Sequence, residues 1–133
     1  MSPDSPGAPI RVIAAVDDLF FGARIQETAR RLGVPFRLVG SAEEAAALAR
    51  AAAPALLIVD LNAAAGRPLD AVRGLRTDPA VQGMTILGFC SHVQQELRAA
   101  AAEAGCDRVL ARSAFTAELP ELLCPYGEAK GEA

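Results

Sequence analysis

Five short apolar runs alternate along the chain with longer stretches in which apolar and polar residues recur at helical spacing. Apolar runs rich in Val, Ile and Leu are typical of parallel strands that are buried on both faces. The predicted strands cover residues 11–16, 36–39, 56–59, 84–90 and 108–111. The predicted helices cover residues 20–32, 42–53, 68–77, 92–104 and 116–123. This strict alternation predicts an α/β fold with right-handed crossovers and a parallel sheet covered on both faces.

Capping residues and prolines mark the ends of several predicted helices. Ser41 is a typical N-cap, and Glu44 three residues later completes a capping box. Gly105 follows the fourth helical stretch and is typical of a C-terminal cap. Pro125 ends the last helix, which is therefore predicted to be short, with Pro120 in its first turns, where a missing N–H costs little.

Three aspartates stand at the carboxyl ends of two of these apolar runs. Asp17 and Asp18 close the first run, and Asp60 closes the third. Open α/β sheets place their ligands at the carboxyl edge, so these side chains are expected to lie together. Grouped carboxylates repel unless a cation or a proton intervenes, which indicates a divalent metal and chemistry on one of them. The alternatives are structural: Asp18 is also suited to cap a helix, and Asp60 to end a strand.

Length and composition favour a single domain between two polar tails. A chain of 133 residues with 52% hydrophobic content can bury one sizeable core. Residues 1–9 hold three prolines and are predicted to be a disordered tail. The domain is predicted over residues 10–124, followed by a polar tail over 125–133.

Charge and cysteine content exclude several classes of function. A net charge of −3 with scattered arginines argues against nucleic-acid binding, and no apolar run approaches the roughly 20 residues of a membrane span. The N-terminus lacks the pattern of a secretory signal, so the cytoplasm is expected. Cys90, Cys106 and Cys124 form no CxxC pair, and His92 cannot complete a zinc site with them. Cys106 and Cys124 are expected to be small buried apolar residues.

Four stretches carry a resemblance to a known family. VDDLFFGARI, LLIVDLN, ILGFCSH and GCDRVLARSAF resemble the signature stretches of CheY-like receiver domains of response regulators, at the mutual spacings usual in that family. The resemblance spans about residues 11–123. It implies a flavodoxin-like (βα)5 fold, with a doubly wound five-stranded parallel sheet of order 2-1-3-4-5 and a site above strands 1, 3 and 4.

The resemblance also implies roles for the acidic residues. Asp60 matches the phosphoacceptor, while Asp17 and Asp18 match the acidic pair that binds Mg²⁺ together with it. Asn62 matches the position whose backbone carbonyl is the remaining protein ligand. Mg²⁺ prefers oxygen ligands and retains several waters, so this set suits it. Asp60 would then act as a nucleophile and form an acyl phosphate.

The positions that change on activation in the family differ here. Cys90 stands where the family has Ser or Thr, and a thiol is a weaker donor to a phosphoryl group. Ser91 could supply a hydroxyl only if the end of the strand were rearranged. Arg112 matches the family's lysine, and its planar fork is not equivalent to an ammonium. Ser113 replaces the usual proline, which argues against a cis peptide, and Val109 replaces the aromatic switch residue.

Two functions agree with this combination. The first is a single-domain receiver in two-component phosphorelay signalling, a phosphoprotein and not an enzyme, which signals by protein contact. The implied partners are a sensor histidine kinase or other phosphodonor protein and a downstream target on the strand 4–helix 4–strand 5–helix 5 face. A homodimer is also compatible with the sequence. The alternative is a pseudo-receiver, a phosphorylation-independent interaction module. A flavin- or nucleotide-binding enzyme is disfavoured, since no GxGxxG or GxxxxGK[ST] motif occurs.

Overall fold

The computed structural model describes residues 9–63, 67–91 and 95–127. Its strands are β1 (Val12–Ala15), β2 (Phe36–Val39), β3 (Leu56–Asp60), β4 (Thr85–Cys90) and β5 (Arg108–Ala111). Its helices are α1 (Leu19–Arg31), α2 (Ala42–Ala52), α3 (Pro68–Arg76), α4 (Gln95–Ala104) and α5 (Arg112–Leu123), with the short 3-10 helices η1 (Pro79–Val81) and η2 (Cys124–Tyr126). Most of the two predicted tails and the predicted start of the fourth helix at 92–94 lie outside the described residues. Within those ranges, no helix combines the length and the apolar character that crossing a membrane requires.

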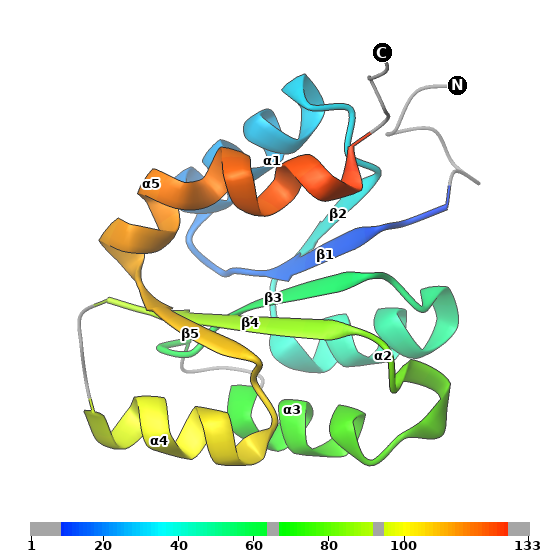
Figure 1. The fold of residues 1–133 in the computed structure, drawn as a ribbon, viewed down its shortest axis with the longest axis vertical. Coiled ribbons are helices and arrows are strands. Elements are labelled where there is room, and N and C mark those ends of the chain that lie inside the picture. The colour runs from blue at the N-terminus through cyan, green and yellow to red at the C-terminus, as the bar shows by residue number, and fades with distance from the viewer. Residues whose placement is uncertain (1–8, 64–66, 92–94, 128–133) are drawn as a thin grey trace.

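The five strands form one parallel sheet in the order β2-β1-β3-β4-β5, which confirms the predicted topology. Helices α1 and α5 cover one face of the sheet, and α2, α3 and α4 cover the other (Figure 1). This three-layer arrangement follows from right-handed crossovers, which return each strand parallel to the one before it.

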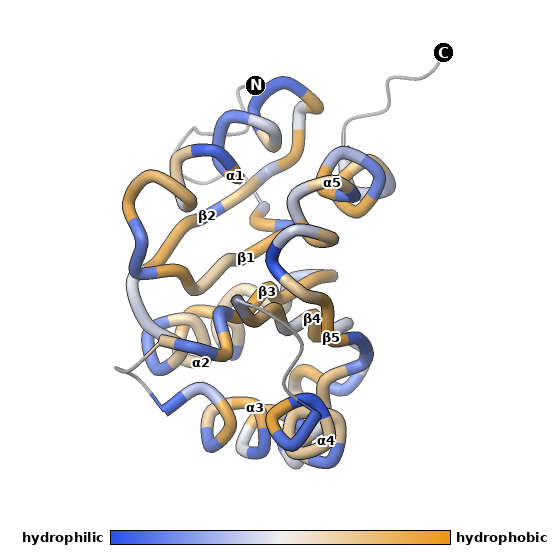
Figure 2. The backbone as a smooth tube through the Cα atoms, turned by 90° about the vertical axis from the view of Figure 1, so that its left-hand side faces the viewer, coloured by the Kyte–Doolittle hydropathy of each residue, from blue (hydrophilic) through white to orange (hydrophobic). Residues whose placement is uncertain are grey.

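The central strands are apolar because both of their faces are buried. Successive side chains of a strand point to opposite faces. Ile13 and Ala15 of β1 belong to the core beneath α2, α3 and α4, whereas Val12 and Ala14 belong to the core beneath α1 and α5. The sheet is accordingly hydrophobic along β1 and β3, while the helices mix both kinds of residue (Figure 2).

The predicted caps of α2 and α4 are present, with one difference in detail. The Ser41 hydroxyl accepts a hydrogen bond from the Glu44 N–H at 3.2 Å, as expected of an N-cap. The Glu44 carboxylate accepts from Gly40 N–H at 3.1 Å, one residue before the cap. Gly105 has φ +129° and donates to Ala102 O while the next N–H donates to Ala101 O, which is the Schellman arrangement that favours glycine.

Helix α5 begins earlier than predicted. It starts at Arg112, directly after β5, so the prediction of a short helix from residue 116 is wrong. Pro120 consequently lies inside the helix, where it removes one backbone hydrogen bond. Phe115, Leu119 and Leu123 are spaced by four residues and all buried, and this apolar stripe offsets the loss. None of the described peptide bonds is cis, in keeping with Ser113 in place of proline.

The chain continues against the domain beyond α5. Cys124 is exposed, so the expectation that it is buried is wrong: α5 ends at the buried Leu123, and the backbone turns into η2 there. The predicted polar tail over 125–133 includes Tyr126, which belongs to η2 and contacts the domain. Tyr126 packs against the core beneath α1 and α5, and the Arg11 guanidinium lies 5.7 Å from its ring centroid.

Candidate functional site

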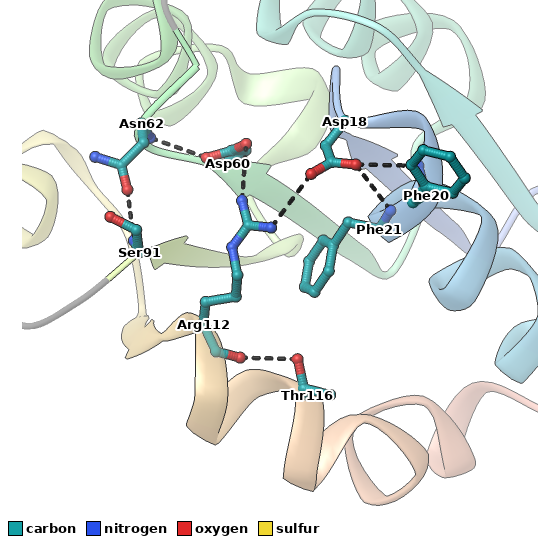
Figure 3. Close-up of polar contacts among 8 residues, drawn as sticks. All are labelled: Asp18, Phe20, Phe21, Asp60, Asn62, Ser91, Arg112 and Thr116. Atoms are coloured by element: carbon teal, nitrogen blue, oxygen red, sulfur yellow. Dashed lines mark hydrogen bonds and ion pairs between the residues drawn. The ribbon is translucent and has the colours of Figure 1, made fainter.

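The carboxyl ends of β1 and β3 bring the acidic residues to one edge of the sheet. The two strands are direct neighbours, with Ala15 paired to Val59. Asp60 is the last residue of β3, and Asp17 and Asp18 follow β1 after one further residue, Val16. Asp18 and Asp60 approach the same guanidinium from two sides (Figure 3).

Asp60 is a buried carboxylate, with 4% of its surface exposed. Its Oδ1 accepts a hydrogen bond from the Asn62 N–H at 2.9 Å. Burial raises the pKa of Asp60 above its ordinary value, and the negative charges of Asp17 and Asp18 raise it further. The Asn62 N–H and the Arg112 charge oppose this rise. The surroundings of Asp60 therefore disfavour its ionised form, which is typical of a carboxylate with a chemical role.

Asp18 serves the fold and the pocket at the same time. Its backbone is extended, and its Oδ1 accepts from the N–H groups of Phe20 at 3.0 Å and Phe21 at 3.1 Å, which makes it the N-cap of α1. The Phe21 N–H is the main cause that lowers the pKa of Asp18. The other oxygen, Oδ2, lies 3.6 Å from Nη1 of Arg112. The structural alternative for Asp18 is thus correct, but it does not exclude the second role.

Asp17 is exposed at the same edge. Its charge contributes to the raised pKa of Asp60, so the two groups are within electrostatic reach of one another. Contact of Asp17 with a ligand of the pocket stays a prediction.

Arg112 links the two sides of the pocket. It is the first residue of α5, at the end of β5, where the sequence comparison with the family's lysine placed it. Its Nη2 lies 3.9 Å from Asp60 Oδ2, and its Nη1 faces Asp18. The side chain is 32% exposed. The Arg112 side chain therefore reaches the pocket and does not turn away from it.

An aromatic cluster supports Arg112 from below, and the sequence analysis did not identify it. Phe21, Phe89 and Phe115 come from α1, β4 and α5, with ring centroids 4.8 to 5.9 Å apart. The Arg112 guanidinium lies 4.3 Å from the Phe21 ring centroid, within the range of a cation–π contact. One signal for this cluster is present in the sequence. Phe21 follows the cap Asp18 by three residues, and residues three apart lie on the same face of a helix.

Three further predicted residues lie around the ends of β3 and β4. The Asn62 side chain accepts a hydrogen bond from the Ser91 N–H and thereby ties the two strand ends together. Cys90 is fully buried, and its thiol approaches the Leu110 carbonyl of β5 at 3.9 Å. Ser91 is exposed at the edge. The contacts of Cys90 and Ser91 with a phosphoryl group stay predictions.

The donor chemistry of the pocket suits Mg²⁺, because every protein ligand would be a carboxylate or carbonyl oxygen. Asp17 and Asp18 raise the pKa of Asp60, which indicates negative charge around Asp60 that a cation would offset. Over the part of the chain that the structure describes, no three His, Cys, Asp or Glu side chains are grouped so as to hold an ion. Arg112 lies between two of the carboxylates. Mg²⁺ binding by these aspartates and the Asn62 carbonyl stays a prediction.

Of the remaining cysteines, Cys106 shows what a purely structural thiol is like in this fold. It is buried, and burial together with the charge of Asp107 raises the pKa of the Cys106 thiol to about 11. Such a thiol is protonated and unreactive near neutral pH. This confirms the expectation of a small apolar residue at this position.

Comparisons with known proteins support the fold at low sequence identity. No protein-family model matches the chain, and no curated protein does. A response regulator from Hahella chejuensis is 17% identical with a TM-score of 0.79, over 93% of this chain and 99% of that one. The chemotaxis response regulator CheY4 of Vibrio cholerae is 19% identical with a TM-score of 0.77, over 88% and 98%. A CheY-like receiver domain protein from Methanospirillum hungatei is 15% identical with a TM-score of 0.75, over 86% and 90%. The chain therefore has the CheY-like receiver fold of response regulators, the family that its four motifs resemble.

Proposed function

We propose that the chain is a receiver module of two-component signal transduction in which Asp60 accepts a phosphoryl group. One observation supports this more than any other: a buried carboxylate lies at the carboxyl edge of the sheet, beside two further aspartates and a guanidinium. A strand-ending aspartate with only a structural role has no need of this surrounding charge. The receiver fold itself suggests two-component signalling.

The chemistry proposed for Asp60 is nucleophilic substitution at phosphorus. Asp60 Oδ1 is occupied by the Asn62 N–H, which leaves Oδ2 on the side of Arg112 as the attacking oxygen. The new bond joins this oxygen to phosphorus, while the bond to the donor breaks and its electron pair leaves with the donor. The charge of Arg112 offsets the repulsion between the carboxylate and the incoming anion. Mg²⁺, when bound by the aspartates, would add charge stabilisation of the same kind.

The surroundings of the pocket suit a protein as phosphodonor. Leu19 and Phe20 are 82% and 90% exposed, and they directly follow Asp18 at the start of α1. Large apolar side chains so exposed beside a nucleophile are more often covered by a partner than left in water. We infer that a sensor histidine kinase or another phosphodonor protein contacts this rim, and that a downstream protein contacts the face formed by β4, α4, β5 and α5.

A second candidate function is a pseudo-receiver that binds partners without phosphorylation. Two observations favour it. Arg112 already neutralises part of the pocket, and the Cys90 thiol approaches the Leu110 carbonyl of β5. In this alternative the acidic pocket is part of a binding surface, and Asp60 never carries a phosphoryl group.

Phosphorylation of the purified chain separates the two candidates. After incubation with Mg²⁺ and acetyl phosphate, we expect intact-protein mass spectrometry to show the addition of one phosphoryl group, because the donor supplies it directly to Asp60. Asp60→Asn should abolish the addition, since an amide oxygen is a poor nucleophile and the shape is preserved. The control Asp70→Asn changes an exposed carboxylate of α3 that pairs with Arg67 and Arg73, and it should be phosphorylated like the parent. An unchanged mass at saturating donor contradicts the receiver function and leaves the pseudo-receiver.

A further inference from the structure

The four oxygens of Asp18 and Asp60 are all engaged by donors of the chain itself. One oxygen of each carboxylate accepts backbone N–H groups, from Phe20 and Phe21 on one side and from Asn62 on the other. The second oxygen of each faces a different nitrogen of Arg112, at 3.6 and 3.9 Å. A divalent cation between the two carboxylates would meet the Arg112 guanidinium, which lies against one oxygen of each.

We propose that Arg112 is a competing cation of the acidic pocket, a latch that a divalent metal ion must displace from its position between Asp18 and Asp60. The inference rests on the proposed function, because it concerns the metal site of the same receiver pocket. Arginine suits the role of a bridge, because its planar fork presents a separate nitrogen to each of the two carboxylates, whereas an ammonium would have to reach both from one nitrogen. Replacing lysine by arginine at this position thus changes what the pocket binds, and not only its geometry.

The way in which Arg112 is held indicates a contact that can open. Its ion pairs are longer than the 2.7–3.2 Å of N–H···O hydrogen bonds, so the attraction is mainly electrostatic. The Nε atom is out of contact with solvent and has no hydrogen-bond partner among the described residues. A buried donor without a partner costs free energy, and that cost is removed when the side chain swings out to water. The latch is therefore less stable than a fully hydrogen-bonded pair.

The face of the Phe21 ring stabilises the Arg112 guanidinium and offsets the free-energy cost of its unpaired Nε. The guanidinium lies 4.3 Å from the Phe21 ring centroid and 5.6 Å from that of Phe89. The Arg112 backbone is anchored at the start of α5, where the Thr116 hydroxyl donates to its carbonyl at 2.9 Å. Only the side chain has to move to open the latch, and the helix stays in place.

Mg²⁺ binding measured by isothermal titration calorimetry tests the proposal without any phosphodonor. Arg112→Gln removes the charge and keeps a polar side chain of similar shape, and we expect it to bind Mg²⁺ about tenfold more tightly than the parent or better, since a unit charge about 4 Å from both ligands is gone. The control Arg73→Gln removes the same charge from the exposed face of α3 and should change the affinity less than twofold. Adding Asp60→Asn to Arg112→Gln should cancel the gain.

A second variant, Arg112→Lys, tests the proposal if Arg112→Gln does not fold. Circular dichroism would show whether each variant is folded. Arg112→Lys keeps the charge but not the fork, so its Mg²⁺ affinity should lie between those of the parent and Arg112→Gln. Equal Mg²⁺ affinity of the parent and the folded Arg112 variants overturns the proposal, and so does an equal gain in affinity in Arg73→Gln.

The result of the Mg²⁺ titration can be told apart from the result of the phosphorylation experiment. A gain in Mg²⁺ affinity with no acyl phosphate on the parent supports the latch and removes the proposed function, whereas phosphorylation with no gain does the reverse.

Discussion

Replacing Phe89 with alanine is expected to lower the free energy of unfolding by about 3–5 kcal/mol, the usual cost of truncating a fully buried phenylalanine. The side chain is 0% exposed and stacks on Phe115, with ring centroids 4.8 Å apart at an interplanar angle of 16°. Phe21 adds a tilted contact at 5.2 Å. Truncation leaves a cavity between β4 and the helices α1 and α5, which cannot close without moving the sheet.

Urea denaturation followed by circular dichroism measures this effect. Phe20→Ala is the matched control, because Phe20 is 90% exposed and its truncation should change stability by less than about 0.5 kcal/mol. If the two alanine variants were equally stable, the aromatic cluster would not be the packing centre that the structure shows. The cluster also supports the Arg112 guanidinium, so its loss would affect the pocket as well as the core.

Replacing Arg76 with alanine is expected to cost about 2–4 kcal/mol, because one side chain ties three parts of the fold together. Its Nε donates to Gly105 O at 2.8 Å and its Nη1 to Met84 O at 2.9 Å. Its Nη2 pairs with the Asp107 carboxylate, which also accepts from the Ile86 N–H. Arg76 thus connects the end of α3 to the start of β4 and to the turn before β5, and its removal leaves several acceptors unpaired.

Arg73 provides the comparison, since it lies three residues earlier on the same helix and pairs only in exposed positions. Its partner is Asp70, and the two side chains are 53% and 55% exposed. Such pairs contribute little, so Arg73→Ala should change the free energy of unfolding by less than about 0.5 kcal/mol. Thermal and urea unfolding of both variants should agree in rank. A loss for Arg76→Ala no larger than that for Arg73→Ala contradicts the bridging role.

The fold was predictable because its determinants are local or periodic. The short apolar runs identify buried strands, and the rule for crossovers then leaves few topologies for alternating strands and helices. The ends of β2 and β5 agree with the predicted ranges to the residue. The site was predictable in outline for the same reason: a carboxylate that follows a strand must lie at the edge of the sheet, wherever its neighbours fall in the sequence.

Other features depend on contacts that no local pattern encodes. The start of α5 was missed because Pro120 suggested a first turn, whereas the burial of Phe115 and Leu119 determines where the helix begins. The cluster beneath the pocket combines residues from three elements far apart in the chain. Arg112 was identified by position alone, and its double contact depends on the register of β1, β3 and β5 together.

The pocket combines a feature that the sequence predicts, the aspartates at the edge of the sheet, with one that depends on long-range contacts, the position of Arg112. Asp18 and Asp60 lie at the carboxyl edge of the sheet, and the cation between them is an arginine of the chain. A receiver with this arrangement has to exchange one positive charge for another before the phosphoryl group arrives. If Asp60 accepts a phosphoryl group as we propose, the departures from the family at Cys90 and Val109 would affect how the phosphorylated state is held and transmitted.

A crystal structure of the chain grown with Mg²⁺ and beryllofluoride, a mimic of the phosphoryl group, tests the central claim most directly. We predict that the mimic is bound to Asp60, that the metal ion is bound by Asp17 and Asp18, and that the Arg112 side chain has left Asp18. A structure at saturating beryllofluoride with Arg112 still between Asp18 and Asp60, and with no fluoride complex on Asp60, would contradict the account.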